Sequence, residues 1–213
     1  MHPTEPPQSP RLPIAPHRQY RDFVAADECA ALLDWALANK ARFMPGVLRK
    51  GVVQPEVRRS RVLRDLGELR PLLKQRLLDQ CARLVDDLSM APFVAGHVEL
   101  ELAAHNDGDS FVLHTDTYTG DDRPERGDRM VSGVYYFHRE PKAFSGGSLR
   151  LHRFGATLEA PRDFLDVEPE QNSLVVFPSW APHEVRPVAC PSKSFADSRF
   201  SVNCWIYRPR GQP

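Results

Sequence analysis

From about residue 94 onward, short segments rich in β-branched and aromatic residues follow one another with no helical pattern between them. In the first, residues 97–102 (HVELEL), polar and apolar side chains alternate with a period of two, which predicts a strand with one buried face. Turn sequences such as NDGD, RPERGD and EPEQN separate the segments. The other candidate strands span residues 111–114, 130–137, 147–151, 173–177, 183–188 and 199–207. Many short strands without intervening helices predict an antiparallel sandwich or barrel.

Two helical patterns precede these strands. Asp27 is a suitable cap for a helix that continues through CAALLDWALANKARF, and its apolar face would be formed by Leu33, Ala36, Leu37 and Ala41. Pro71 suits the first turn of a second helix, whose positions for burial are Leu73, Leu77, Leu84 and Leu88. We therefore expect an α+β, mainly β fold with the N-terminal helices packed on one sheet.

The N-terminal segment is rich in proline, because six of the 20 prolines lie in the first sixteen residues. We expect residues 1–18 to form a flexible lead-in, with a proline-rich docking motif as the alternative. Residues 19–213 are expected to form a single domain, with helical support over 25–92 and a β core over 93–208.

The composition excludes several classes of protein. The 213 residues contain 28 basic and 28 acidic side chains, and this balance argues against a globally basic nucleic-acid binder. No apolar stretch is long enough to cross a membrane, and the N-terminus lacks the apolar region of a secretory signal. The scattered cysteines favour a reducing, cytoplasmic location over a zinc site or disulfides; they are Cys29, Cys81, Cys190 and Cys204. We expect no nucleic-acid or membrane partner, and no pattern indicates an oligomeric state.

One local charge imbalance stands out within this neutral chain. Residues 42–76 contain ten lysines and arginines against three acids. A solvated face is the ordinary interpretation, and a patch for an anionic partner is the alternative.

Two histidines are each followed two residues later by a carboxylate. His114 ends the apolar run FVL, so its side chain and that of Asp116 would project from one side of a strand end. His138 and Glu140 instead lie in a charged turn that ends at Pro141, which is a poorer geometry for a shared ligand. Phosphate-binding and hydrolase motifs such as GxxxxGK[ST], GxSxG and HExxH are absent.

A third histidine and a strand arginine extend the first pair. His183 follows the predicted strand SLVVF and the turn PSWAP, and with His114 and Asp116 it would complete a three-ligand face typical of non-haem Fe(II) oxygenases. Arg199 begins the last predicted strand. An arginine directed into a barrel needs an anionic partner, either a bound carboxylate or a protein acid.

Taken together, these motifs resemble a known family. HTD, GVYYF, SGGSLRL, FPSWAPHEV and RFSVNCWIY follow one another in the order seen in the 2-oxoglutarate- and Fe(II)-dependent dioxygenases, and most closely in the prolyl 4-hydroxylase-like branch; they lie at residues 114–116, 133–137, 145–151, 177–185 and 199–207. The resemblance covers about residues 95–207 and implies a double-stranded β-helix, or jelly roll, for the β core.

The resemblance also implies roles for individual residues. His114, Asp116 and His183 would be the Fe(II) ligands, and Arg199 would pair with the distal carboxylate of 2-oxoglutarate. The other residues expected to contact or enclose the cosubstrate are Tyr136, Ser201, Trp205 and Leu149, of which Tyr136 would supply a hydroxyl to the same carboxylate. Dioxygen is the further cosubstrate, and ascorbate is an expected reductant.

The implied activity is hydroxylation of a C–H bond with release of succinate and CO2. The substrate could be a prolyl residue in a protein or peptide, a free amino acid or another small metabolite. A jelly-roll or cupin-like binding protein that holds a metal or small molecule without 2-oxoglutarate turnover is the alternative.

Three features depart from the pattern or bear on the substrate. His105 lies where relatives often carry an aromatic hydroxyl residue near the cosubstrate, and we expect it to be a hydrogen-bonded structural residue rather than a fourth ligand. The segment 117–129 is long and charged, and could close over the site or form a surface hairpin. The irregular segment 43–62 is a second candidate for substrate contact.

Overall fold

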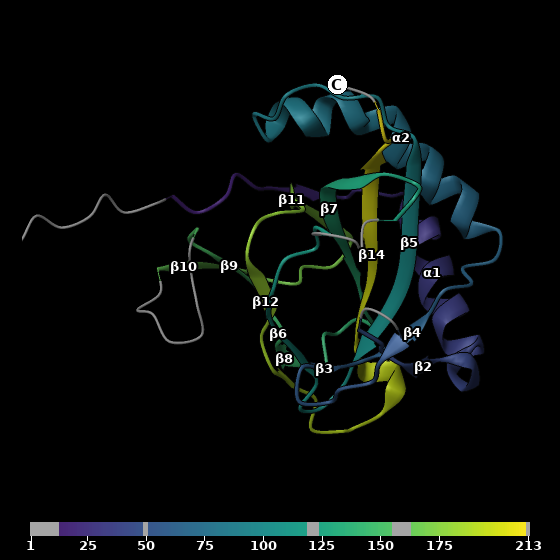
Figure 1. Ribbon diagram of the computed structural model, residues 1–213. Coiled ribbons are helices and arrows are strands. Elements are labelled where there is room, and N and C mark those ends of the chain that lie inside the picture. Colours follow the sequence, from purple (N-terminus) through teal and green to yellow (C-terminus); the bar gives the residue numbers. More distant parts are fainter. Residues whose placement is uncertain (1–12, 49–50, 119–123, 155–162, 212–213) are drawn as a thin grey trace, which may run out of the picture.

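A computed structural model of the protein describes residues 13–48, 51–118, 124–154 and 163–211 (Figure 1). Two α-helices are present in these residues, α1 (Ala26–Ala38) and α2 (Leu69–Asp87). The strands before and between the helices are β1 (Arg18–Arg21), β2 (Met44–Pro45), β3 (Arg58–Arg59) and β4 (Arg61–Leu63). Those after α2 are β5 (His97–His105), β6 (Ser110–His114), β7 (Asp128–Phe137), β8 (Ser145–Gly146), β9 (Leu149–His152), β10 (Phe164–Val167), β11 (Ser173–Pro178), β12 (His183–Val185), β13 (Val188–Ala189) and β14 (Arg199–Arg208).

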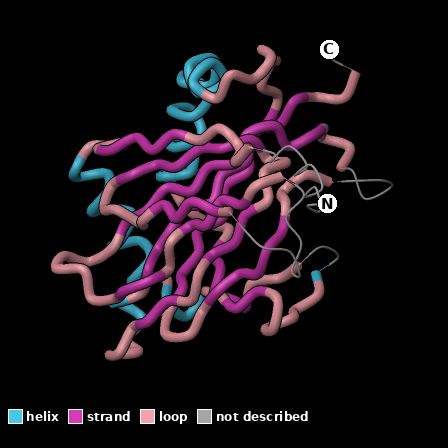
Figure 2. The backbone as a smooth tube through the Cα atoms, turned by 90° about the vertical axis from the view of Figure 1, so that its left-hand side faces the viewer, coloured by secondary structure: helices cyan, strands magenta, loops and turns pink. Residues whose placement is uncertain are grey.

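The strands form two main antiparallel sheets. The major sheet has seven strands in the order β1-β11-β7-β14-β5-β4-β2, and the minor sheet has five in the order β10-β9-β12-β6-β3. A cluster of buried apolar side chains, including Phe177 from β11 and Leu151 from β9, joins the two sheets. Both helices lie on the far side of the major sheet (Figures 1 and 2). The predicted mainly β fold with N-terminal helices on one sheet is confirmed.

The central strand β14 separates two different environments. It pairs with β5 on one side and with β7 on the other. Its side chains alternate because successive residues of a strand point to opposite faces. Phe200, Val202, Cys204 and Ile206 belong to the core under the helices. Arg199 begins the opposite set, which faces the minor sheet and also contains Ser201, Asn203 and Trp205.

The first helix differs from its prediction in two details. It begins at Ala26, so Asp27 lies inside the first turn, and the backbone N–H of Ala25 is bonded at 2.8 Å by the Glu28 carboxylate instead. The buried face is formed by Cys29, Leu32 and Ala36, while Leu33 and Leu37 are half-buried beside it. Ala41 is exposed because the α-helix ends at Ala38 and a short 3₁₀ turn follows. In the second helix, Pro71 lies in the first turn and all four predicted leucines are buried.

The N-terminal prediction concerns residues that are only partly described. Residues 1–12 of the expected lead-in lie outside the described residues. The part that follows is packed: Ile14 forms an isolated β-bridge with Arg153, Ala15 is buried, and β1 is the edge strand of the major sheet, paired with β11. Neither helix in the described part of the chain combines the length and apolarity needed to span a bilayer.

The helix-to-sheet contact can be tested on two leucines of α2. Leu84 is fully buried and Leu72 is 55% exposed. Leu84→Ala should lower the free energy of unfolding by about 2–5 kcal/mol, because it leaves a cavity against the sheet. Leu72→Ala, the matched control, should change it by no more than about 0.5 kcal/mol. Urea denaturation measures both, and equal losses would contradict the assignment of the buried face.

Candidate active site

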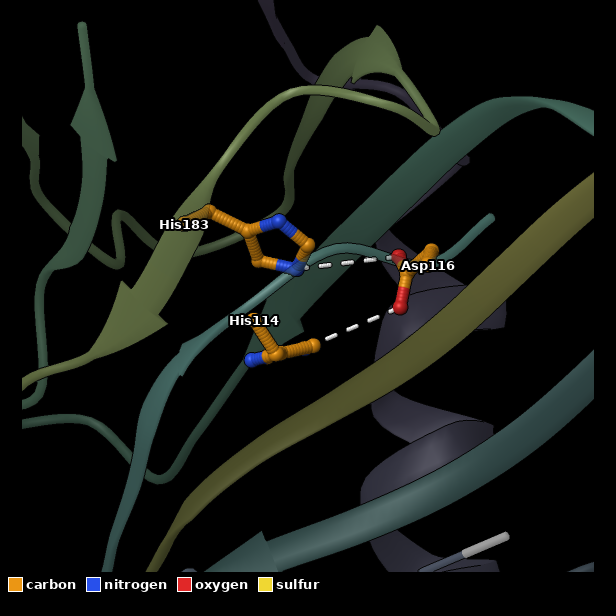
Figure 3. A group of neighbouring side chains, drawn as sticks. All are labelled: His114, Asp116 and His183. Atoms are coloured by element: carbon orange, nitrogen blue, oxygen red, sulfur yellow. Dashed lines mark ion pairs between the residues drawn. The ribbon is translucent and has the colours of Figure 1, made fainter. Parts of the chain in front are cut away.

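Three side chains converge where two neighbouring strands of the minor sheet, β6 and β12, meet. His114 ends β6, His183 begins β12, and the two residues are paired across these antiparallel strands. Asp116 follows β6 by two residues and points toward both (Figure 3). Its carboxylate oxygens lie 3.7 Å from Nε2 of His114 and 3.6 Å from Nε2 of His183. One ligand atom from each residue lies within 4.8 Å of the others, so the three side chains can bind one metal ion.

The orientation of both imidazoles is set by backbone carbonyls. Nδ1 of His114 lies 2.8 Å from the carbonyl oxygen of Val112, and Nδ1 of His183 lies 2.9 Å from that of Ala181. A carbonyl only accepts, so each Nδ1 carries the hydrogen and each Nε2 presents its lone pair to the cluster. Burial, together with the neighbouring His183, lowers the pKa of His114 to about 3, so this imidazole is neutral and can act as a ligand.

The turn between β11 and β12 holds the cluster together. Pro178 and Ala181 close it with a 2.9 Å backbone hydrogen bond. The carbonyl of Ser179 accepts hydrogen bonds from the backbone N–H groups of Asp116 (2.9 Å) and Thr117 (3.2 Å). The sequence around His183 therefore also fixes the position of Asp116, although the two residues are far apart in the chain.

The Asp116 carboxylate is held in its ionised form. The Ser132 hydroxyl donates to it at 2.7 Å. Burial acts against ionisation, but the charge that His183 and His114 can carry, together with Arg129 and this hydrogen bond, outweighs it and lowers the pKa of Asp116 to about 2. The side chain is therefore an anionic ligand at neutral pH.

The competing pair lies elsewhere. Nδ1 of His138 is 2.9 Å from the carbonyl of Arg139 and 3.5 Å from the Glu140 carboxylate, which is mostly exposed. Within the described residues, His138 belongs to no group of three side chains that could hold a metal.

Arg199 is buried at the start of β14, with 1% of its surface exposed. Its Nε donates to the carbonyl of Gly147 at 2.7 Å. Gly147 has a φ of +70°, and a Cβ there would lie 2.7 Å from Cδ of Arg199, so only glycine accommodates this approach. The second glycine of SGGSLRL, Gly147, thus provides space for the arginine. No carboxylate in the described part of the chain pairs with its guanidinium.

Three polar atoms around this guanidinium lack a well-formed hydrogen bond. They are Nη2 of Arg199, the Tyr136 hydroxyl and Nε2 of His105, and all three are buried. The Tyr136 ring lies 4.7 Å from the guanidinium carbon. Nη1 of Arg199 is 3.4 Å from Nδ1 of His105. A guanidinium can only donate, so Nδ1 accepts and the hydrogen of His105 is on Nε2. A buried anion would satisfy this cluster of donors.

A small cavity joins this cluster to the three convergent side chains. It is lined by residues of both sheets, among them Arg199, His105, His183, Leu149 and Trp205. Tyr136 and Ser201 do not line it, and the Ser201 hydroxyl lies 3.4 Å from the Asn203 side chain. Sequence reasoning missed several of the lining residues: Phe111, Gly133, Val134, Val185 and Asn203. The signal for Asn203 is strand alternation from Arg199, because the two residues lie on the same face of β14.

A much larger cleft opens from the same place toward solvent. Its volume is about 1250 Å³, and it reaches His114 and Asp116 at its floor. The segment 43–62, which was expected to be irregular, forms part of one wall and contains β2, β3 and most of β4. Tyr118 and Arg126 contribute from the other candidate loop, of which residues 119–123 lie outside the described residues. Trp205 lines both the cleft and the small cavity, and Arg129 stacks on its ring at 4.0 Å.

Comparison with known proteins agrees with these features. Residues 100–207 match the family model described as the 2OG-Fe(II) oxygenase superfamily. A protein from Synechocystis named as an uncharacterized PKHD-type hydroxylase is 34% identical over 193 residues. This alignment includes 88% of the present chain and 62% of the relative, so the chain spans less than two thirds of that protein's length.

Solved structures share the fold. A Pseudomonas putida prolyl-4-hydroxylase is 25% identical with a TM-score of 0.64, and the alignment covers 91% of this chain and 93% of that one. A prolyl hydroxylase from Trichoplax adhaerens, solved with a peptide fragment of a hypoxia-inducible factor, has a TM-score of 0.60 at 18% identity and covers 90% and 83% of the two chains. From the match over half its length, the chain belongs to the 2OG-Fe(II) oxygenase superfamily, in agreement with the prolyl 4-hydroxylase-like resemblance of its motifs.

Proposed function

We propose that this protein is an Fe(II)- and 2-oxoglutarate-dependent dioxygenase that hydroxylates a C–H bond and releases succinate and CO2. The observation that carries the proposal is the position of the buried Arg199 guanidinium, with an unsatisfied Nη2, in the same cavity as His114, Asp116 and His183. A protein that only held a metal ion would have no use for this buried cation.

The three convergent side chains suit Fe(II). Two neutral imidazoles and one carboxylate are the ligand set of non-haem Fe(II) oxygenases, and they leave coordination positions open for cosubstrate and dioxygen. When bound, the iron and 2-oxoglutarate supply the oxidative chemistry, in which decarboxylation is coupled to hydroxylation of the substrate. The protein's own task is to hold the ligands in place, through the carbonyls of Val112 and Ala181 and the Ser132 hydroxyl.

The donors around Arg199 suit the distal carboxylate of 2-oxoglutarate. We assign Nη2 of Arg199 and Nε2 of His105 as donors to it, because both residues line the cavity and neither atom has another partner in the described structure. Burial, Arg199 and Arg58 lower the pKa of His105 well below its usual value, so it donates as a neutral imidazole. Tyr136 is assigned as a third donor from its place against the guanidinium. Leu149 and Trp205 would enclose the cosubstrate, and Ser201 would support Asn203 from the same strand.

We further propose that the substrate is an amino-acid residue within a peptide or protein, such as a prolyl residue. The cleft of about 1250 Å³ is larger than the roughly 300–1000 Å³ typical of small-molecule pockets, so it suits a longer ligand than a free amino acid. The similar Pseudomonas putida protein is named as a prolyl-4-hydroxylase.

A reducing, cytoplasmic setting with ascorbate as the reductant completes the proposal. All four cysteines are buried as free thiols, as expected in a reducing compartment. A reductant would keep the iron in the Fe(II) state that this ligand set binds.

The metal assignment can be tested by removing one imidazole. His183→Ala should weaken Fe(II) binding by more than about 100-fold, because even a lost outer partner of a metal ligand costs 10–100-fold. His97→Ala is the control, since His97 lines the cleft but lies outside the cluster. Anaerobic titration with Fe(II) measures the affinity of both variants for the metal. Similar losses in the two would contradict the assignment.

The cosubstrate assignment predicts that substitutions of Arg199 and His105, at the other end of the cavity, weaken 2-oxoglutarate binding to different degrees. Arg199→Met should weaken 2-oxoglutarate binding by about 30-fold or more, because a buried charge partner is worth at least about 2 kcal/mol. His105→Phe should weaken it by about 10-fold, and His105→Gln by less, because glutamine retains an N–H donor. Iron affinity should be unchanged in all three.

Calorimetric titration of the metal-loaded protein with 2-oxoglutarate gives these affinities, and thermal melting without cosubstrate separates a folding defect. Equal loss of iron and 2-oxoglutarate binding in the arginine variant would indicate a purely structural role. Retention of full 2-oxoglutarate affinity in His105→Phe would remove His105 from the site.

The oxygenase activity itself is distinguished from simple binding by two measurements on the intact chain. A weak visible charge-transfer band should form anaerobically only when both Fe(II) and 2-oxoglutarate are present. Succinate should then accumulate on admission of dioxygen with a suitable peptide. If neither the band nor succinate is observed across peptides and free amino acids, a jelly-roll binding protein becomes the better description.

A further inference from the structure

Among the basic side chains of the segment 42–76, some are engaged in salt bridges and some line the cleft. Arg42 bonds Asp65, which itself lines the cleft, and Arg76 bonds Glu28. The large cleft is lined by three other arginines of this segment, Arg58, Arg64 and Arg70. Arg129 from β7 and Arg126 from the loop before β7 line it as well. Part of the positive charge of the segment 42–76 therefore lies in the cleft that opens beside the proposed metal ligands.

The carboxylates of the cleft already have close cationic partners. Glu101 on β5 bonds Arg58 at 2.6 Å, and both side chains are less than 10% exposed. Glu99 bonds Arg129 at 3.0 Å and accepts the hydroxyl of Tyr207 at 2.6 Å. Asp65 pairs with Arg42 at 2.7 Å. The remaining carboxylate, Asp116, belongs to the metal site. These acids are thus neutralised before a ligand arrives.

Three arginines of the cleft have no such partner among the described residues. Arg64 is 70% exposed and lies 3.8 Å from the Glu101 carboxylate, which Arg58 bonds more closely at 2.6 Å. Arg126 is 47% exposed and lies 4.0 Å from Glu99, which Arg129 holds more closely. Arg70 donates to the backbone carbonyls of Arg64 and Leu100, and no carboxylate lies within ion-pair distance. Among the described residues, the cleft therefore presents positive charge that no close carboxylate compensates.

We propose that the substrate of this cleft is an acidic polypeptide segment, in which carboxylates flanking the hydroxylated residue pair with Arg64, Arg70 and Arg126 of its lining. This inference rests on the proposed oxygenase function and specifies its substrate class. Arginine suits the purpose because its planar guanidinium binds carboxylates in a bidentate manner.

A nucleic acid would be a poorer occupant of the same arginines. Glu99 and Glu101 also line the cleft, but Arg129 and Arg58 already bond them. Only three arginines of the described lining lack a close carboxylate partner, whereas a nucleic acid carries a phosphate at every unit. A polypeptide can instead place carboxylates only where these arginines lie and neutral residues between them.

The test uses three labelled peptides of equal length with the same central proline-containing sequence and with acidic, neutral or lysine-rich flanks. Binding to the full chain, loaded anaerobically with Fe(II) and 2-oxoglutarate, is measured by fluorescence anisotropy at low and high salt. The acidic peptide should bind most tightly, and salt should reduce the difference. Arg64→Gln, Arg70→Gln and Arg126→Gln should each weaken its binding by up to about fivefold, the range of an exposed ion pair.

Two variants sharpen the comparison. Arg64→Glu should narrow or reverse the preference between the acidic and lysine-rich peptides. Arg18→Gln removes one positive charge from the exposed strand β1, away from the cleft, and should leave the preference unchanged. Thermal melting confirms that each variant is folded.

The outcomes separate this inference from the proposed function because the 2-oxoglutarate-dependent absorption band is recorded on the same samples. If the band forms but the three peptides bind equally, or none binds, or the lysine-rich peptide binds best, the acidic-substrate inference is wrong while the oxygenase assignment stands. Tighter binding of a single-stranded oligonucleotide than of the acidic peptide would also overturn it. If the band does not form, the proposed function fails, and the inference fails with it.

Discussion

The position of β14 between β5 and β7 is the constraint on which the site depends. A strand bonded on both sides cannot shift its register without breaking two ladders, so its alternation of side chains is fixed. One face must be apolar because two helices cover it. The other face is free to carry polar residues, and Arg199, the first residue of the strand, lines the small cavity between the sheets.

The helices therefore serve the site indirectly. They bury the apolar face of the major sheet and leave the opposite face for the cavity between the sheets. The minor sheet has little apolar core of its own and is joined to the rest through a small cluster that includes Phe177 and Leu151. Backbone hydrogen bonds add to this connection, since Ser179 at the end of β11 holds the chain at Asp116. The three convergent side chains are thus held by paired strands and backbone hydrogen bonds, and the large cleft opens beside them.

Sequence reasoning succeeded where the physical signal was local. Strand alternation and turn residues predicted strands in seven regions, and the leucine spacing of α2 identified its buried face. The region 183–188 is not one strand, however, because it is divided between β12 and β13 of two different sheets. Sequence reasoning was less accurate for α1, where Asp27 was wrongly taken as the cap. The helix begins at Ala26, and the Glu28 carboxylate reaches back to the N–H of Ala25, while Asp27 accepts only the N–H of Glu28. The short strands β2, β3, β4 and β10 carry too few residues for a periodic pattern and are formed by pairing with their neighbours.

The sequence alone determined the residue types available for chemistry and their order along the chain, because the motifs from His114 to Trp205 are readable without coordinates. The tertiary structure decided which of them meet. It brought His183 beside His114 through strand pairing and separated His138 from them. It placed the unsatisfied Nε2 of His105 in the cavity that Arg199 lines. It also gave Glu99 and Glu101 close arginine partners, whereas Arg64, Arg70 and Arg126 have no close carboxylate partner among the described residues. The reason is physical: a pairing between distant residues depends on burial and strand register, and neither quantity is a property of a short stretch of sequence.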